Sequence, residues 1–564
     1  MELLGQKSSF STDSLQNLAA RHADTLLSFL NDPNQLIELD LDVSSAASST
    51  GSTVATAPEA SSSSAVADVD PSVLRRVRKI VADVAGLPEA DVDPSQTSLA
   101  ALGLDSVSAI RICSEARKVG LQLSLRDVIE ATTCAQIAAH SAAPVQEVDT
   151  PVSDSVPCLP GQIYQLASAD AGIIPSHYVF ALDMLEAVPH AQVAAAWQRL
   201  ADTHTIIKAR RQDDMTLHLE TAVAPRQIQL EGDLREAIAR ATRGAMAPAV
   251  LLHFVSSDKS ILVLALGHFL YDARSLELLL QDLKSAVAGN EISSRLPSLA
   301  SFAAQAQQDC RSSASQQYWS KSLTGLRGAA LADSRKVDKQ AFARFPAQVK
   351  GIEAARARLL KQGVSYNLQT LVMLALAKTL AGLSGENAAT IGLQHSGRSS
   401  SFPGLDVLPG PCTNIQPLFV KNTAGEPSRV AAAIAQDLAA RRDFEQTSLK
   451  DIADWIGLPA DAPLFDSVLN ILWDASAPTT DGPILVDLGE PFYHLFRPTT
   501  SSPSGIEAYQ RHVAVSLSID VASDRKSDVL DMAVKYDIGR LSELQVKSIV
   551  KSFSEHIHTL FQSA

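Results

Sequence analysis

The stretch of residues 44–65 constrains the fold of this chain more than any other feature. It contains nine Ser, three Thr and six Ala residues with a single charged residue. A segment of this composition cannot bury enough apolar surface to offset the conformational entropy lost on ordering. We therefore predict a flexible linker over residues 44–69, with separate units on either side of it.

A second interruption lies at residues 141–156, where Pro144, Pro151 and several acidic residues break any helical or strand period. Because domains usually contain about 100–200 residues, a chain of 564 residues is long enough for more than one of them. The two linkers leave three pieces, residues 1–43, 70–140 and 157–564.

The first piece is too short for a domain but contains one amphipathic pattern. Its residues Leu18, His22, Leu26 and Phe29 recur at spacings of 4, 4 and 3, which describes an amphipathic helix. The pattern resembles that of the last helix of the chain, around residues 549–560. We expect residues 1–43 to be the tail of a preceding domain similar to the one that ends this chain.

The middle piece carries the start and stop signals of short helices. Asp70 and Pro71 occupy N-cap and N1 positions, and Gly86 ends the apolar pattern that follows. Further helices are expected from Ser106 to Gly120, after Ser124, and in "TTCAQIAAHS". About seventy residues with three or four helices predict a small helical bundle over residues 70–140.

The large piece mixes strand and helix patterns. The run "SILVLAL" (260–266) is typical of a buried strand, and apolar residues at helical spacing follow it until Gly289. The run "LQTLVMLALAKTLAGLSG" predicts a buried helix, and "ATIGLQ" after it predicts another strand. We therefore expect an α/β structure in two lobes over residues 157–564.

Charge and composition exclude several classes of protein. A net charge of −14 without a Lys/Arg cluster provides no surface for nucleic-acid phosphates. No apolar run reaches the roughly 18 residues of a membrane span, and the first residues lack a signal peptide, so we expect a cytoplasmic protein. The five scattered Cys residues predict reduced thiols. We expect no metal site, because His556 and His558 lie two apart on a helix and should be exposed to solvent.

Ser106 is the first candidate for chemistry. It follows a Gly-containing loop and opens a helix, whose N-terminal N–H groups and partial positive charge favour an anionic group. Taken alone, an Asp-Ser pair before an apolar run more often caps a helix. The surrounding seventy residues, however, resemble an acyl- or peptidyl-carrier (thiolation) domain in helix one, in "GLDS" and in "RKVGLQLSLRDVIEATTCAQIA". This resemblance implies that Ser106 carries covalent 4′-phosphopantetheine, attached by a phosphopantetheinyl transferase.

His268 and Asp272 are the second candidates, since they follow the buried strand and precede a helix that Ser275 can cap. A lone H-x-x-x-D is more often a core histidine and a capping aspartate. Residues 157–564, however, resemble the condensation domains of non-ribosomal peptide synthetases, whose motif is H-H-x-x-x-D-G. Further resembling segments occur in the family's order, at "CLPGQIYQ" (158–165), "AWQRLADTHTIIKAR" (196–210), "YW" (318–319), "IGLQHSGR" (391–398) and "GPCTN" (410–414).

The resemblance implies a fold and a set of roles. The fold would be a small all-α carrier four-helix bundle followed by a two-lobed, chloramphenicol-acetyltransferase-like α/β condensation domain, with lobes at about 157–325 and 326–564. His268 would orient or deprotonate the attacking amine. Asp272 would be a structural ion-pair partner of a cation that the sequence does not identify. Asn414 would line the cleft.

Two departures from the motif stand beside His268 and Asp272: Gly267 replaces the first histidine and Ala273 replaces the glycine. We associate a small residue at the first position with fungal and chain-terminating condensation domains. The carrier segments "DSVSAI" and "ARKVGLQLS" also resemble the sequences of fungal hydroxamate-siderophore synthetases of the ferrichrome type.

We therefore expect a carrier and condensation module that holds a peptidyl thioester and catalyses amide formation or chain-terminating cyclisation and release. It would act in hydroxamate siderophore biosynthesis, with upstream modules of the same assembly line as partners. Two alternatives stay open. One is a condensation-like scaffold or docking segment that has lost its catalytic activity, which the replacement of the first motif histidine by Gly267 would indicate. The other is an ester-forming acyltransferase fused to a carrier.

Overall fold

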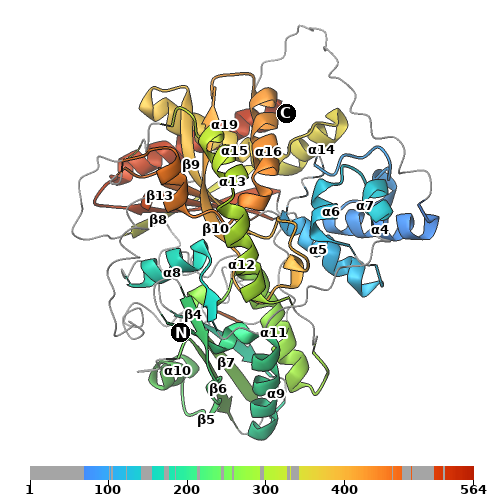
Figure 1. Cartoon of the computed structure of the whole chain (residues 1–564), viewed down its shortest axis with the longest axis vertical. Coiled ribbons are helices and arrows are strands. Elements are labelled where there is room, and N and C mark those ends of the chain that lie inside the picture. Colours follow the sequence, from blue (N-terminus) through green and yellow to red (C-terminus); the bar gives the residue numbers. More distant parts are fainter. Residues whose placement is uncertain are drawn as a thin grey trace.

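The computed structural model of the chain describes two blocks of residues (Figure 1). The first is 69–140, without 101, 103, 105 and 122. The second comprises 155–170, 177–184, 186–212, 216–242, 247–256, 259–292, 297–326, 331, 342–459, 462–472, 484–485, 513–524 and 528–563. The expectations for residues 1–43 and for nearly all of both linkers lie outside these residues.

Residues 69–140 contain helices where the sequence predicts them. Helix α4 (Pro71–Ala85) begins at Asp70, whose carboxylate accepts a 2.8 Å hydrogen bond from the Ser72 N–H, and ends at Gly86 in the left-handed conformation. Ser124 caps the short helix α6. The other elements are η1 (Glu89–Asp91), α5 (Ser106–Lys118), α6 (Leu125–Glu130) and α7 (Cys134–His140). Their buried faces pack together, α4 against α5 and α7, and α6 against α5 and α7.

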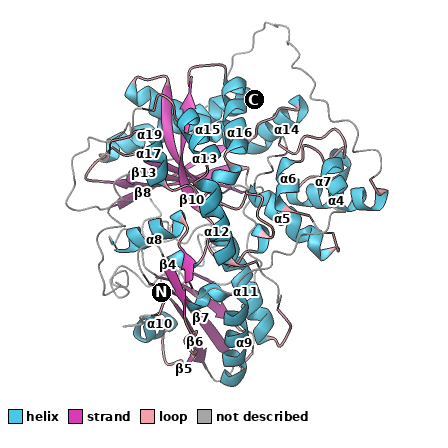
Figure 2. Cartoon of the chain, viewed as in Figure 1, coloured by secondary structure: helices cyan, strands magenta, loops and turns pink. Residues whose placement is uncertain are grey.

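The first lobe is built on a five-stranded sheet in the order β12-β2-β7-β6-β5 (Figure 2). Its strands are β2 (His177–Asp183), β5 (Arg226–Gln229), β6 (Ala249–Val255), β7 (Ser260–Gly267) and β12 (Ile484–Leu485). β7, the predicted buried strand, is buried along its whole length. Its side chains alternate between two apolar layers, as a strand covered on both faces requires.

Helices cover both faces of this sheet. α9 (His190–Thr203) and α11 (Ala273–Val287) pack together in the layer that holds Leu264, whereas α10 (Leu234–Thr242) belongs to the layer of Val263. A small separate sheet has the order β1-β4-β3. The remaining elements are β1 (Ser155–Pro157), α8 (Pro160–Asp170), η2 (Thr205–Lys208), β3 (Ala209–Arg211), β4 (Thr216–Leu219) and η3 (His268–Leu270).

The second lobe has a six-stranded sheet in the order β10-β9-β11-β13-β14-β8. Its strands are β8 (Phe342–Lys350), β9 (Ala388–His395), β10 (Asn414–Lys421), β11 (Phe465–Leu472), β13 (Val513–Asp524) and β14 (Val529–Asp537). Its helices are α14 (Ile352–Gln362), α15 (Leu368–Ser384), η4 (Leu405–Val407), α16 (Pro427–Ala440), η5 (Arg442–Phe444), α17 (Leu449–Trp455) and α19 (Glu543–Ser563). α15 and β9 confirm the predicted buried helix and strand, and α15 packs against α19.

The chain crosses between the lobes more than once. Helices α12 (Leu299–Cys310) and α13 (Ser313–Ser322) make the first crossing, and the fully buried Trp319 donates a 3.0 Å hydrogen bond to Thr447 in the second lobe. The return is β12, which pairs with β2. The predicted division at about residue 326 assigns β12 to the second lobe, but the strand belongs to the sheet of the first. None of the described helices is long and apolar enough to cross a membrane.

Candidate functional site

His268 lies at the point where β7 ends. The strand stops at Gly267, and the chain turns through η3, of which His268 is the first residue. The imidazole is partly exposed and packs against two tyrosines, edge-on to Tyr178 with ring centroids 4.8 Å apart and tilted against Tyr271 at 5.3 Å. The two aromatic rings fix the plane of the imidazole, so its orientation is set by the sheet and by the turn.

Gly267 leaves no room for a side chain. A Cβ atom at this position would lie 2.9 Å from Cε1 of the Phe269 ring and 3.4 Å from the Pro248 carbonyl oxygen. The Gly267 N–H donates a 2.6 Å hydrogen bond to the same carbonyl, which fixes the backbone there. Its φ of −60° is open to any residue, so packing and not backbone conformation favours glycine. The first histidine of the family motif would collide with Phe269.

Asp272 caps helix α11. Its carboxylate accepts hydrogen bonds of 2.8 Å from the Ser275 N–H and 2.9 Å from the Ser275 hydroxyl, while the Asp272 N–H donates to Ser275 Oγ at 2.8 Å. This is a reciprocal capping box. Ser275 therefore contributes to the cap as expected, but as the third residue of the helix: the N-cap itself is Asp272, whose backbone is still extended where the helix begins.

Asp272 also has a buried cationic partner, Arg398, on the loop after β9. Nη2 of Arg398 lies 3.0 Å from Oδ1 and 2.9 Å from Oδ2 of Asp272, and Nε lies 3.2 Å from Oδ2. The Cys412 N–H donates to Oδ2 at 2.9 Å. Only 1% of the Arg398 side chain and 5% of the Asp272 side chain are exposed. Burial alone would lower the pKa of Arg398, but the Asp272 carboxylate, together with Cys412 and Asp406, raises that pKa above its ordinary value.

Arg398 also fixes the shape of the loop around it. Nη1 donates to the carbonyls of Leu405 at 2.5 Å and Leu408 at 3.2 Å, and Nη2 donates to Gly410 at 2.7 Å. A buried guanidinium needs acceptors for all its N–H groups, and this loop and Asp272 together provide them. The resembling segments "IGLQHSGR" and "GPCTN" are thus parts of one structure.

Gln162, in the segment "CLPGQIYQ", is hydrogen-bonded to the turn that contains His268. It is fully buried, and its Nε2 donates a 2.9 Å hydrogen bond to the carbonyl of Phe269. Its Oε1 accepts from the Leu159 N–H at 3.0 Å. The preceding Gly161 lies against the backbone of Thr413, where an added Cβ would be 1.8 Å from the carbonyl oxygen. Helix α8 therefore joins η3 to the start of β10.

Asn414 is buried at the start of β10. Its Nδ2 donates to the Glu445 carbonyl at 2.9 Å, and it pairs with His395 across the sheet. The carboxylate of Glu445 lies 3.9 Å from the His395 ring. Burial raises the pKa of Glu445 to about 7 and lowers the pKa of His395. The amide of Asn414 is thus used within the second lobe, which differs from the expectation that it lines the cleft.

Ser106 is the first residue of α5. The first turn of this helix contains no acidic residue, and the N-terminus of a helix carries a partial positive charge. A phosphate ester on the hydroxyl fits such a position. The 13-residue helix places Ser106 about 16 Å along its axis from Arg117 near the other end.

The structure thus brings His268 and Asp272 onto one turn, with Asn414 at the start of β10 in the second lobe and Ser106 in a separate helical unit. The sequence analysis missed Arg398 and Gln162 as partners of this turn, although both lie in segments that it quoted. No disulfide joins the five cysteines, each of which is described and buried. Within the described residues no cluster of His, Cys, Asp or Glu can hold a metal ion. His556 and His558 are only partly exposed, and His556 lies 3.0 Å from Thr379 Oγ1.

Two family models match the chain. The model described as "Condensation domain" matches residues 176–563, and the model described as "Phosphopantetheine attachment site" matches residues 75–141. Together the matched residues include His268, Asp272, Asn414 and Ser106. The first model alone covers more than half of the chain.

Curated relatives include two fungal synthetases. The chain is 27% identical over 85% of its length to "Nonribosomal peptide synthetase sidC" of Aspergillus fumigatus, and 26% identical over 86% of its length to "Ferrichrome siderophore peptide synthetase" of Mycosarcoma maydis. It spans 11% and 13% of these relatives.

Solved structures share the two-lobed fold. The X-domain from teicoplanin biosynthesis matches with a TM-score of 0.56 and 17% identity, over 74% of this chain and 97% of that one. The epimerization domain of tyrocidine synthetase B matches with a TM-score of 0.54 and 15% identity, over 74% of this chain and 98% of that one. These likenesses confirm the fold that we expected for the large piece.

Proposed function

We propose that this chain, which belongs to the condensation-domain family and also carries a phosphopantetheine-attachment domain, transfers an acyl or peptidyl group from its own carrier to an amine, forming an amide. The main support for this proposal is that two residues of one turn, Asp272 and His268, have different surroundings. Asp272 is held from behind by Arg398, and His268 is left as the partly exposed titratable group of the motif.

We assign residues 70–140 to the carrier and residues 157–564 to the condensation domain, with lobes at about 157–325 and 326–564 except that β12 completes the sheet of the first lobe. The family matches at 75–141 and 176–563 support this division. The helices α4, α5, α6 and α7 would form the four-helix bundle of the carrier, and Ser106 would receive 4′-phosphopantetheine from a phosphopantetheinyl transferase. When attached, the group supplies a terminal thiol on which the acyl or peptidyl chain is held as a thioester.

His268 would act on the attacking amine. An α-amine has a pKa near 8, so a neutral imidazole within hydrogen-bond distance can orient it and accept its proton as the new bond forms. General-base catalysis of this kind contributes about 10²- to 10⁴-fold. The contacts with Tyr178 and Tyr271 would hold the ring in one orientation. Positioning of the two reactants would supply much of the remaining acceleration.

Asp272 would be a positioning residue and not a second base. Its two oxygens accept hydrogen bonds from Arg398, from Ser275 and from the Cys412 N–H. A carboxylate engaged in this way has little capacity left for a substrate proton. For Asn414 we likewise propose a structural role, since its amide holds the Glu445 backbone.

The relatives suggest a wider setting. Because two of them are a non-ribosomal peptide synthetase and a ferrichrome siderophore peptide synthetase, we propose that this chain serves an assembly line that makes a siderophore peptide. Upstream modules would deliver the peptidyl chain. Whether the amine belongs to the donor chain itself or to another carrier decides between cyclisation and linear condensation.

Loading tests the carrier assignment. The chain is incubated with a phosphopantetheinyl transferase and coenzyme A, and its intact mass is measured. We expect the wild type and a Ser108→Ala control to gain one phosphopantetheine, and Ser106→Ala to gain none. An unmodified wild type, or modification of Ser106→Ala, would refute Ser106 as the attachment site.

A further inference from the structure

The carrier helices meet the second lobe at several places. Ser98 Oγ donates to the Val364 carbonyl at 3.4 Å, and α5 contacts η4. The charges of Glu130 and Arg126 on α6 act on Arg442 of η5. The carrier therefore lies on a defined face of the second lobe, which Figure 1 shows beside α14 and α16.

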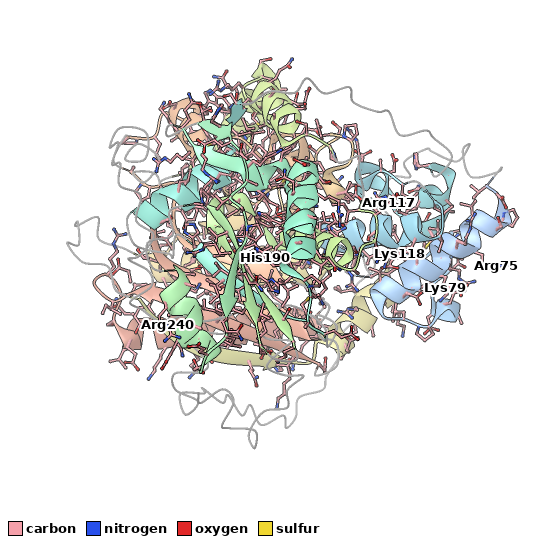
Figure 3. The ribbon with its side chains drawn as sticks, turned by 90° about the horizontal axis from the view of Figure 1, so that it is seen from below. Arg75, Lys79, Arg117, Lys118, His190 and Arg240 are labelled. Carbon is pink, nitrogen blue, oxygen red and sulfur yellow. The ribbon has the colours of Figure 1, made fainter. Side chains whose placement is uncertain are left out.

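The closest polar contact on this face joins Arg117 to Asp406. Nη2 of Arg117, near the end of α5, lies 2.6 Å from Oδ2 of Asp406 in η4. The Asp406 side chain is 4% exposed, whereas that of Arg117 is 50% exposed. In Figure 3, Arg117 lies on the side of the carrier that faces the rest of the chain, and Arg75 lies at the far edge. A charge-assisted bond to a buried carboxylate is directional, so it selects one orientation of the carrier.

Asp406 is connected to the candidate active site through its backbone. Its carbonyl accepts a 2.9 Å hydrogen bond from Nε of Arg274, in the first turn of α11 just after Asp272. The preceding carbonyl, of Leu405, accepts from Arg398, the partner of Asp272. The residue that contacts the carrier is therefore fixed by two arginines that also fix the helix start behind His268.

We propose that Asp406 is the docking residue for the chain's own carrier domain, which it recognises through Arg117 at the end of α5. Engagement of this pair holds the carrier against η4 while the acyl chain is delivered. This inference rests on the proposed function for its purpose, but the docking itself is a property of the protein before any group is attached.

The test measures docking separately from catalysis. The five native cysteines are buried, so a spin label should react mainly with new, exposed cysteines. Labels on Lys79→Cys in α4 and Leu544→Cys in α19 then report the distance between the carrier and the second lobe by pulsed electron paramagnetic resonance. Both native side chains are well exposed, Lys79 at 65% and Leu544 at 80%. The variants are Arg117→Glu, Asp406→Arg and the two combined. Lys118→Glu is the matched control, because Lys118 pairs with Glu115 in its own helix.

We expect each single variant to broaden the distance distribution and, once loaded, to slow transfer by about tenfold, the effect of losing one charge-assisted hydrogen bond. The charge-swapped double variant should regain a narrow distribution and most of the rate, and Lys118→Glu should match the wild type. Single variants with an unchanged distribution, or a double variant as disordered as the singles, would overturn the proposal. If the wild type accepts the acyl phosphopantetheine but never transfers the acyl group, the proposed function fails. The spin-label distances still test the docking of the carrier in that case.

Discussion

Asp272 and Arg398 lie 126 residues apart in the sequence, yet the Arg398 guanidinium is 2.9 Å from the Asp272 carboxylate in the core between the two lobes. One partner begins a helix of the first lobe, and the other follows a strand of the second. The pair therefore fixes the lobes relative to each other at the turn that carries His268.

Removing one partner should be costly. Arg398→Ala leaves the Asp272 carboxylate buried without its cation, and such a loss typically destabilises a protein by about 3–5 kcal/mol. The free energy of unfolding from denaturant titration measures the effect. Glu277→Gln, whose exposed carboxylate pairs with Arg274, serves as the control and should change it by less than about 1 kcal/mol. An Arg398→Ala protein as stable as this control would contradict the assigned role.

Restoring the first histidine of the motif should not help this protein. Gly267→His, like Gly267→Ala, places a Cβ 2.9 Å from the Phe269 ring, and overpacking of this kind costs about 1–3 kcal/mol. We predict lower melting temperatures for both variants and no gain in transfer rate. A second change, Phe269→Ala, should relieve the collision. A Gly267→His protein with wild-type stability and faster transfer would show that a side chain fits there.

Gln162→Ala should impair the histidine turn without touching the substrate. It leaves the Phe269 carbonyl without its donor, and a buried acceptor left in this way costs about 1–3 kcal/mol. We expect kcat to fall while KM stays nearly unchanged, and the His268 ring resonances to shift in NMR spectra. The exposed Gln198→Ala variant is the control. Unshifted His268 resonances in Gln162→Ala would count against a positioning role.

Glu445 predicts a dependence of stability on pH. Because burial raises its pKa to about 7 from an ordinary value of 4.5, the folded state is favoured while the carboxyl is protonated, and this contribution is lost as pH rises from 4.5 through 7. Glu445→Gln should therefore gain about 3 kcal/mol relative to wild type at pH 8, but nothing near pH 4. Unfolding titrations at both pH values measure the difference, with Glu555→Gln as an exposed control. A gain at pH 4 equal to that at pH 8 would rule out the titration as its cause.

Local signals made much of the fold predictable. Asp70, Pro71 and Gly86 mark the ends of α4 because capping depends on residues next to one another in the sequence. β7 could be predicted because a strand buried on both faces must be apolar throughout. β12 could not, since two residues that complete a distant sheet leave no pattern of their own.

The candidate site was predictable only in part. His268 and Asp272 follow a strand and precede a helix, so their proximity follows from local structure. The cation that pairs with Asp272 comes from the other lobe, and no periodicity identifies Arg398 for that role. The reason for Gly267 lies in the packing of Phe269, which only the folded structure reveals. The contact between Arg117 and Asp406 could not be predicted either, because nothing in the sequence distinguishes these two residues from ordinary surface charges.

If His268 drives the release of the acyl chain held on Ser106, measurements of intact mass over time should show it. The protein is loaded with an acyl phosphopantetheine from the corresponding acyl coenzyme A, and an amine acceptor is then added. We predict that the wild type loses the acyl mass and forms the amide, while His268→Ala, equally loaded and folded, does so at least about 100-fold more slowly. A His268→Ala protein that releases the acyl group at the wild-type rate would show that His268 does not catalyse this transfer.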